Sequence, residues 1–305
     1  MRIAVPLVAA LVAGGCGGTV AFRSTSSSGS STVAATATGA GVSAPSGSPR
    51  IIDSSFYSPA VRGRLHYQIA LPPGYATSGK RYPVLYVLHG LPASAQAFMG
   101  VAGYAGRLAA TNDPAIVVGA QGARPGDTDP EWHNWGPGRD WETATQHDLV
   151  AYIDHHYRTI ARRAGRGIIG ISAGGYGATL IAIHHPATYQ VIESWSGYFE
   201  ITDPDGKPLD LGSVEANADA SAHANVPRLK REFARYPKTF FGFYIGSHDP
   251  YTHFIADNKR LDRELTAAAI PHLFALYPGA HNGTFWRMHQ DQWLDGAVDR
   301  LAPPT

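Results

Sequence analysis

GIIGISAGGYG, the stretch from Gly167 to Gly177, decides the fold. In it a short apolar run is followed by Ser172, which has glycines before and after it. Residues 170–174 fit G-x-S-x-G, the pattern of a sharp turn that lifts a serine between a strand and a helix. Glycines two positions before and after Ser172 leave room for such a turn. A phosphate-binding loop is disfavoured because no lysine follows these glycines. A plain packing turn stays open at this point.

Segments with strand and helix patterns alternate on both sides of this turn. Apolar runs predict strands at residues 64–75, 82–90, 114–122, 166–172, 189–197, 239–249 and 271–281, the first of them at a sheet edge. Helical patterns predict helices at residues 141–160, 174–186, 227–237, 254–270 and 284–301. The alternation predicts an α/β fold, a mostly parallel sheet with helices on both faces. Ligands of such sheets bind at the carboxyl ends of the strands.

Two residues at predicted strand ends could activate Ser172. A catalytic serine needs a histidine to remove its proton and a carboxylate to fix the tautomer of that histidine. Asp249 and His281 end two later strands, in the order serine, acid, histidine that the α/β-hydrolase layout has. We therefore predict that Ser172, Asp249 and His281 form a catalytic triad.

The chain has other candidates for acid, base and metal ligand, since it holds 14 histidines. The pairs His155–His156 and His184–His185 lack a third metal ligand at suitable spacing, and we expect the second pair to cap a helix or face water. Asp257 and Asp262 lie on a predicted helix and are expected to be solvated. No metal and no cofactor are predicted.

Two backbone N–H groups are predicted to bind the oxyanion of the reaction intermediate. One belongs to Ala173, directly after the serine at the start of the predicted helix. The other comes from the loop HGLPAS that follows the strand at 82–90, which makes Leu91 the predicted donor. His89 and Gly90 would shape this loop.

The N-terminus MRIAVPLVAALVAGGC, residues 1–16, has the pattern of an export signal: one arginine, an apolar stretch too short to span a membrane, and small residues. Cys16 stands where a bacterial lipobox is cleaved and lipidated, although Ala13 replaces the preferred leucine. We expect an exported lipoprotein of the cell envelope, with free secretion as the alternative. Residues 17–49, rich in Ser, Thr, Ala and Gly, predict a disordered linker before a catalytic domain at 50–305.

Composition narrows the function classes further. The chain of 305 residues is 44% hydrophobic and 16% charged, as globular proteins are. A net charge of +1 supplies no field to attract nucleic acid, so no nucleic-acid partner is predicted. Membrane contact is expected only through a lipid at Cys16. Since Cys16 is the only cysteine, the domain has no disulfide of its own.

Five motifs together resemble one known family, the esterase D and antigen 85-type esterases, which include S-formylglutathione hydrolases, feruloyl esterases and mycolyltransferases. The motifs are PVLYVLHG, WETATQHDLVAYIDHHYRTIA, GISAGGYGATLIAIHHP, GSHDP and YPGAHNGTFWRMH, and the similarity covers residues 54–295. The resemblance implies an α/β-hydrolase fold with Ser172, Asp249 and His281 as triad, and it supports Leu91 and Ala173 as oxyanion donors. Many members carry a bulky residue where this chain has Ala173, so the floor of the acyl pocket can differ.

The aromatic loop at 129–143 lies beside the active site, according to the same resemblance. Trp132 and Trp135 stand there among Gly, Pro, Asn and Asp, and we predict that they wall a pocket for an acyl or aryl group. Trp141 and Trp195 are expected in the core, and Glu142 is expected to favour a helix dipole rather than to act in catalysis. The polar segment between Trp195 and Pro227 is too short for a large lid.

The sequence as a whole predicts a serine esterase that forms an acyl-enzyme and hydrolyses a carboxylic ester. Its substrate is expected to be a small-molecule ester or one linked to a glycolipid or polysaccharide. An acyltransferase that passes the acyl group to an envelope sugar hydroxyl is the first alternative, because the acyl-enzyme is common to both. A non-catalytic binding protein on a hydrolase scaffold is the second alternative.

Overall fold

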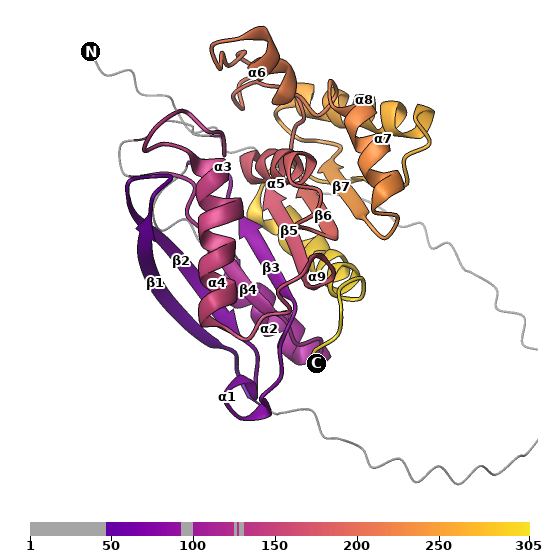
Figure 1. Ribbon diagram of the computed structural model, residues 1–305. Coiled ribbons are helices and arrows are strands. Elements are labelled where there is room, and N and C mark those ends of the chain that lie inside the picture. The colour runs from indigo at the N-terminus through magenta and orange to yellow at the C-terminus, as the bar shows by residue number, and fades with distance from the viewer. Residues whose placement is uncertain (1–46, 93–99, 125–126, 128–130) are drawn as a thin grey trace, which may run out of the picture. The chain divides into compact units, whose positions relative to one another are not determined.

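The computed structural model describes residues 47–92, 100–124, 127 and 131–305 (Figure 1). The predicted export signal at 1–16, including Cys16, and most of the predicted linker at 17–49 lie outside the described residues. By its internal contacts, the unit Ser43–Thr305 is compact. None of the helices among the described residues is long and apolar enough to cross a membrane.

Eight strands form one sheet, and the α/β fold class predicted from the sequence is confirmed. The strands are β1 (Arg50–Ser58), β2 (Gly63–Leu71), β3 (Val84–Leu88), β4 (Ile116–Ala120), β5 (Arg166–Ile171), β6 (Val191–Trp195), β7 (Phe240–Gly246) and β8 (Leu273–Tyr277). Their order in the sheet is β1-β2-β4-β3-β5-β6-β7-β8. β1 and β2 run antiparallel to their neighbours, and the strands from β4 to β8 are parallel.

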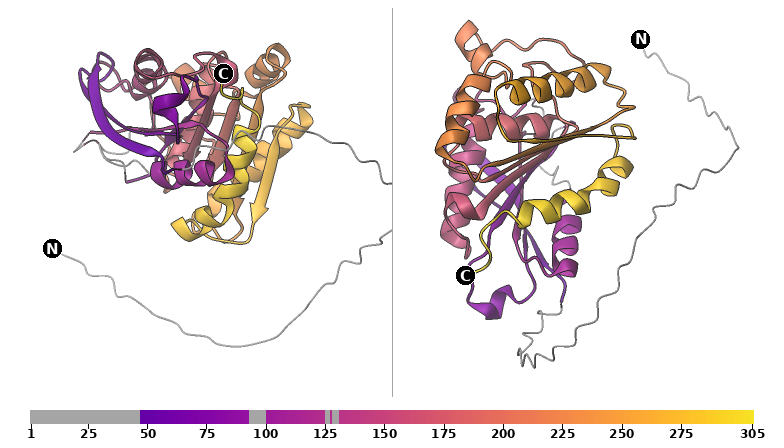
Figure 2. Two further views of the ribbon diagram at one scale, coloured as in Figure 1. Left: turned by 90° about the horizontal axis from the view of Figure 1, so that it is seen from below. Right: turned by 90° about the vertical axis from the view of Figure 1, so that its right-hand side faces the viewer.

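The helices connect these strands and pack on both faces of the sheet. They are α1 (Tyr75–Ser78), α2 (Val101–Thr111), α3 (Trp141–Thr143), the π-helix η1 (Ala144–Leu149), α4 (Val150–His156), the 3₁₀ helix η2 (Arg163–Gly165), α5 (Ala173–His184), α6 (Val214–Asp219), α7 (Val226–Arg235), α8 (Thr252–Ala267) and α9 (Gly283–Val298). One hydrophobic core joins the sheet to α4, α5, α7 and α8, and a second core joins its other face to α2 and α9 (Figure 2). The sheet is thus covered on both sides, as a parallel sheet requires.

β3 is the strand that the apolar pattern predicts best, since all five of its residues are buried. The same holds for β4 and β6. Because both faces of these central strands lie under helices, β3 and β4 are continuously apolar rather than alternating, whereas β6 buries Glu193 and Ser194 within its run. Helix α5, between β5 and β6, is buried on nearly all sides, so it carries almost no polar face.

The first strand of the sheet is one that the sequence analysis missed. β1 pairs over its nine residues, Arg50 to Ser58, with β2, so β2 is internal and the prediction of an edge strand at 64–75 is wrong. β1 is largely exposed, and its sequence RIIDSSFYS lacks the regular alternation that marks a half-buried strand.

Several helices also differ from the prediction, and the short helices α1 and α6 were not predicted. The helix expected at 141–160 contains the π-helix η1 and ends at His156, and Tyr157 is already extended. The chain then pairs Thr159 with Tyr82 before it enters β5. Helix α2 was not predicted, although its buried residues stand at a helical spacing: Val101, Tyr104, Ala105 and Leu108.

Candidate active site

Ser172 sits on the turn between β5 and α5, with backbone angles of φ 57° and ψ −124°. A side-chain-bearing residue rarely adopts a positive φ, and such strain persists only where the surrounding structure holds it. Its N–H donates to the carbonyl of Trp195 at 2.9 Å, which ties the turn to the end of β6. Ser172 is 7% exposed, so its hydroxyl is held in a nearly closed site at the carboxyl edge of the sheet.

Neighbouring glycines allow this turn because backbone passes where a side chain would lie. A Cβ on Gly170 would stand 1.8 Å from the carbonyl oxygen of Gly174. A Cβ on Gly174 would stand 2.2 Å from the carbonyl oxygen of Leu88. Both distances are too short for two atoms that are not bonded to each other. The G-x-S-x-G spacing is therefore a steric requirement of this turn.

A continuous chain of hydrogen bonds links the serine to a histidine and an aspartate. His281 Nε2 lies 2.9 Å from Ser172 Oγ, and His281 Nδ1 lies 2.7 Å from Asp249 Oδ2. The side chain of Asp249 is fully buried, and its second oxygen accepts the N–H of Tyr251 at 3.0 Å. Because Asp249 accepts at Nδ1, that nitrogen carries the proton and Nε2 accepts from the hydroxyl of Ser172. The structure thus brings together the three residues that the sequence analysis selected.

Two aromatic rings that the sequence analysis missed hold the imidazole of His281 in place. Tyr251 and Trp286 contact it edge-on, with ring centroids 5.1 and 5.2 Å away. The indole N–H of Trp286 donates to Ser196 Oγ at 3.0 Å. Trp286 lies one turn into α9 after His281, so a signal existed in the motif HNGTFW. The sequence does not show that the side chain of Trp286 points toward His281, because this depends on the path of α9.

The predicted oxyanion donors lie on the two segments that flank Ser172. Ala173 is the first residue of α5, and Leu91 follows β3 and packs against the apolar cluster that contains Ala173. A Cβ on Gly90 would stand 2.9 Å from the Cβ of Ser172, so the Gly90–Leu91 backbone passes directly beside the serine side chain. This arrangement offers two backbone N–H groups near the hydroxyl. The assignment of both as donors stays a prediction.

His89 fixes the loop that carries Leu91. Its Nε2 accepts the N–H of Gly122 at 3.0 Å, so its Nδ1 carries the proton and donates to the carbonyl of Gly90 at 2.8 Å. Burial lowers the pKa of His89 to about 4, so the ring stays neutral at neutral pH. The neutral ring therefore connects the segments that follow β3 and β4 through two hydrogen bonds, and it adds no charge to the site.

The tryptophans divide between the core and the surface loop. Trp141 and Trp195 are fully buried, as expected. Trp132 is also in the core, 2% exposed, and its ring fills the space that the missing side chains of Gly122 and Gly177 leave. Trp132 therefore supports the loop from within, and the prediction that it walls an open pocket is not kept. Trp135 is partly buried on the same core, and its role in binding substrate stays a prediction.

Three residues outside the site form a buried ionic group where solvated side chains were expected. His184 Nδ1 and His185 Nε2 both lie 2.8 Å from Glu142 Oε1, so neither histidine of this pair simply faces water. Burial raises the pKa of Glu142, but the hydrogen bonds from the two imidazoles outweigh burial and lower it to about 2. Glu142 thus stays ionised and joins α3 to the end of α5. These contacts span more than forty residues, so no local pattern could predict them.

A pocket of about 230 Å³ lies between α2 and α9. Its wall includes Ile171, which directly precedes Ser172, and Trp286, which contacts His281. Most of its lining surface is apolar, and Arg287 stands at its wall.

Known proteins share this architecture. Esterase Rv1288 of Mycobacterium tuberculosis is 29% identical over 289 residues, and the match spans 84% of this chain and 60% of that protein. A ferulic acid esterase structure is 22% identical with a TM-score of 0.67 and covers 83% of this chain and 100% of its own. The S-formylglutathione hydrolase of Staphylococcus aureus is 19% identical with a TM-score of 0.66, at the same coverage. These two likenesses show the fold.

A family model covers most of the domain that holds this geometry. The Esterase model, described as "Putative esterase", matches residues 58–292. That range includes Ser172, Asp249 and His281 together with the strands that position them. Since the match exceeds half of the chain, the chain belongs to this esterase family.

Proposed function

We propose that this protein is a serine esterase that hydrolyses a carboxylic ester through Ser172, His281 and Asp249. The hydrogen-bond chain from Ser172 Oγ through His281 to the buried Asp249 carries this proposal. Its two hydrogen bonds join three residues that follow β5, β7 and β8, which the fold alone brings together. Membership of the esterase family supports the same chemistry.

Acylation starts at the serine hydroxyl. His281 Nε2 removes its proton as Oγ attacks the ester carbonyl, and the ion pair with Asp249 stabilises the imidazolium that forms. The N–H groups of Ala173 and Leu91 donate to the oxyanion of the tetrahedral intermediate, at the positive end of α5. His281 then gives its proton to the leaving alcohol, and the acyl group remains on Ser172.

Deacylation reverses these roles with water as the nucleophile. His281 accepts a proton from the water as it attacks the acyl-enzyme, and it then returns that proton to Ser172 Oγ as the acid is released. An acceptor sugar hydroxyl could replace water by the same steps. The partition of a labelled acyl donor between water and added trehalose measures how far the protein acts as an acyltransferase.

Labelling with a fluorophosphonate probe tests the nucleophile. We expect wild-type protein to react once per chain, and Ser172→Ala to lose both labelling and ester turnover while the circular dichroism spectrum is kept. Ser194→Ala is a control, because Ser194 is also a buried serine at the end of a strand but lies outside the hydrogen-bond chain. A folded wild-type protein that does not label would contradict the proposal.

Asp249→Asn tests the acid. The amide cannot hold His281 in the tautomer that accepts from Ser172, so we expect turnover to fall by about 10⁴ with the fold kept. Asp262→Asn is the control, since Asp262 binds a different imidazole, His272, at 3.0 Å. Near-normal turnover of Asp249→Asn would show that the acid is elsewhere.

We also propose that the protein is exported and anchored to the cell envelope by a lipid at Cys16. The arginine, short apolar stretch and small residues before the only cysteine support this proposal.

The substrate of the proposed esterase is a separate question. A panel of esters with varied chain length and leaving alcohol would define which ester the protein hydrolyses.

A further inference from the structure

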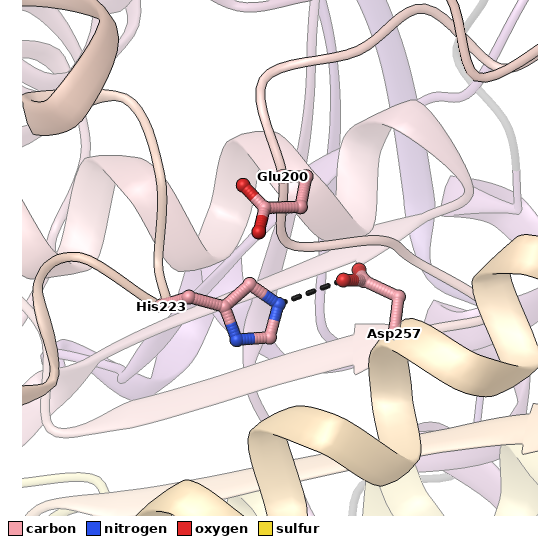
Figure 3. A group of neighbouring side chains, drawn as sticks. All are labelled: Glu200, His223 and Asp257. Carbon is pink, nitrogen blue, oxygen red and sulfur yellow. Dashed lines mark hydrogen bonds and ion pairs between the residues drawn. The ribbon is translucent and has the colours of Figure 1, made fainter.

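Three side chains from distant parts of the sequence converge on one point away from Ser172. Glu200 follows β6, His223 lies between α6 and α7, and Asp257 lies on α8 (Figure 3). One ligand atom from each residue lies within 4.8 Å of the others. His223 Nε2 and Asp257 Oδ1 are 2.7 Å apart. Figure 3 shows the imidazole beside the carboxylate of Asp257, with Glu200 facing the same ring from the neighbouring loop.

We propose that Glu200, His223 and Asp257 bind a divalent transition-metal ion, with Zn²⁺ as the best match. Zinc accepts both imidazole nitrogens and carboxylate oxygens as ligands, and in a site with three protein ligands water takes the fourth position. The imidazole disfavours Ca²⁺ and Mg²⁺, which prefer oxygen ligands. Tetrahedral zinc with bonds of about 2.1 Å needs ligand atoms ~3.4 Å apart.

Neighbouring groups already orient the three ligands. His223 Nδ1 lies 2.5 Å from Glu264 Oε2, so the ring can donate there and present Nε2 to the metal. Metal-binding histidines commonly donate their second nitrogen to a carboxylate in this way. Asp257 accepts the N–H of Phe199 at 2.5 Å through the oxygen that does not face His223. Glu200 accepts the hydroxyl of Ser221 at 3.0 Å.

The charges of the group also favour a dication. Glu200, Asp257 and Glu264 contribute three negative charges, and among the described residues Arg260 is the guanidinium that pairs with two of them. With a neutral imidazole the net charge is therefore −2. Of the three carboxylates, that of Asp257 is largely buried at 11% exposure, and an unbalanced charge is costly there. One divalent ion would cancel it.

A proton on His223 Nε2 would compete with the metal for this nitrogen. The two carboxylates favour a charged imidazole, and burial, which opposes that charge, is outweighed, so the pKa of His223 is raised. An ion-paired imidazolium would satisfy the same contacts and leave a net charge of −1. The pair of His272 and Asp262 shows such an arrangement with a single carboxylate at 3.0 Å. The third carboxylate, Glu200, distinguishes the proposed site from this simple pair.

Metal binding there would fasten the segment that leads from β6 to α7 onto α8. The neighbouring Asn258 already donates to the carbonyl of Gly197 at 2.8 Å, so the metal would add to the connections that exist between the same two segments. Its effect is on stability and involves none of the residues assigned to ester hydrolysis. The proposal therefore goes beyond the proposed function and does not depend on it.

Equilibrium dialysis of the chelator-treated full chain against Zn²⁺ tests the site. We expect one zinc ion per chain, together with a higher midpoint of thermal unfolding. Glu200→Gln and Asp257→Asn keep the size of each side chain, and each should weaken zinc binding at least ~10-fold and remove the thermal shift. Co²⁺ should bind with the same dependence on both residues and show the absorption bands of a low-coordinate site.

Asp262→Asn is the matched control, because it removes a carboxylate from the other histidine pair and should leave zinc binding unchanged. This control is needed because surface histidines such as His155 and His156 can bind zinc weakly. Equal zinc affinity in the wild type and in the double variant Glu200→Gln/Asp257→Asn would overturn the proposal. So would the absence of stoichiometric zinc in the wild type, since His223 would then be ion-paired only.

Discussion

Ser172 occupies a backbone conformation that costs about 1–3 kcal/mol, and neighbouring residues hold it there. This strain presents Oγ to His281 and leaves the N–H of Ala173 at the free end of α5. Ser196, at the end of the next strand, also has a positive φ, of 53°, and accepts the indole N–H of Trp286. The strained residues thus stand at the carboxyl ends of adjacent strands, around the imidazole that both of them help to place.

The triad could be predicted because each of its members lies within four residues after the end of a strand. A strand pattern fixes which residues reach the carboxyl edge of the sheet, and chain order then separates Asp249 and His281 from their rivals. Side chains that act through packing could not be predicted in this way. Asp257 was expected to face solvent, yet it hydrogen-bonds to His223 from 34 residues away, because the helix face that turns inward depends on the neighbouring loop.

Because the carboxyl of Glu193 is buried, we expect the free energy of unfolding to depend on pH. It is fully buried on β6, and burial raises its pKa from 4.5 to about 8. Between these values the folded protein binds more protons than the unfolded chain, so stability falls as pH rises. We expect Glu193→Gln to be more stable than wild type at pH 8, with a gap that shrinks toward pH 5 by up to about 1.4 kcal/mol per pH unit.

Thermal unfolding midpoints between pH 5 and 8 measure this gap. The amide of Glu193→Gln can still accept the indole N–H of Trp195, which is 3.0 Å from Glu193 Oε2 in the wild type. Glu215→Gln, at an exposed position on α6, should follow the wild-type curve. A constant gap between Glu193→Gln and wild type across this range would show that the carboxyl is ionised throughout.

At the scale of elements, the turn between β5 and α5 is set by close backbone approach. The glycines at 170 and 174 let the start of α5 lie against the end of β3, so the nucleophile and the loop of Leu91 come within reach of each other. The sequence predicted this unit well because the glycine spacing and the apolar strand are both local. It predicted β1 poorly because an exposed edge strand carries little periodicity, and its pairing with β2 is what defines it.

Gly174→Ala tests the steric role of the turn. The added Cβ would meet the backbone carbonyls of Leu88 and His89 at 2.2 and 2.6 Å, and backbone cannot move aside as a side chain can. We expect a loss of about 3 kcal/mol in stability and of fluorophosphonate labelling. Denaturant unfolding and the probe measure the two effects.

Gly106→Ala is the matched comparison for this substitution. Gly106 lies within helix α2, and nothing stands within 4 Å of the position that its Cβ would take. Alanine favours a helix over glycine by up to about 1 kcal/mol, so this variant should gain stability and keep full labelling. Equal effects of the two substitutions would contradict the steric account of Gly174.

For the whole molecule, the order of strands explains why one edge of the sheet holds the chemistry. The parallel strands β3, β5, β6, β7 and β8 are neighbours, so their carboxyl ends meet, while β1 and β2 extend the sheet away from the site. This order could not be predicted from strand patterns alone, because pairing partners are chosen by packing across the whole domain. The alternation of strands and helices was enough to predict the layers but not the neighbours.

The attachment of the whole protein to the membrane can be tested at Cys16. If Cys16 carries the lipid that holds the protein to the envelope, Cys16→Ser should move the protein from the membrane fraction to the soluble fraction of the producing cells or their medium. Ser24→Ala, a change in the serine-rich segment that follows, should leave the protein in the membrane fraction. Fluorophosphonate labelling of both fractions reports the folded domain wherever it is, because Ser172 lies far along the chain in the unit Ser43–Thr305. A labelled Cys16→Ser protein that stays in the membrane would show that the attachment does not depend on this cysteine.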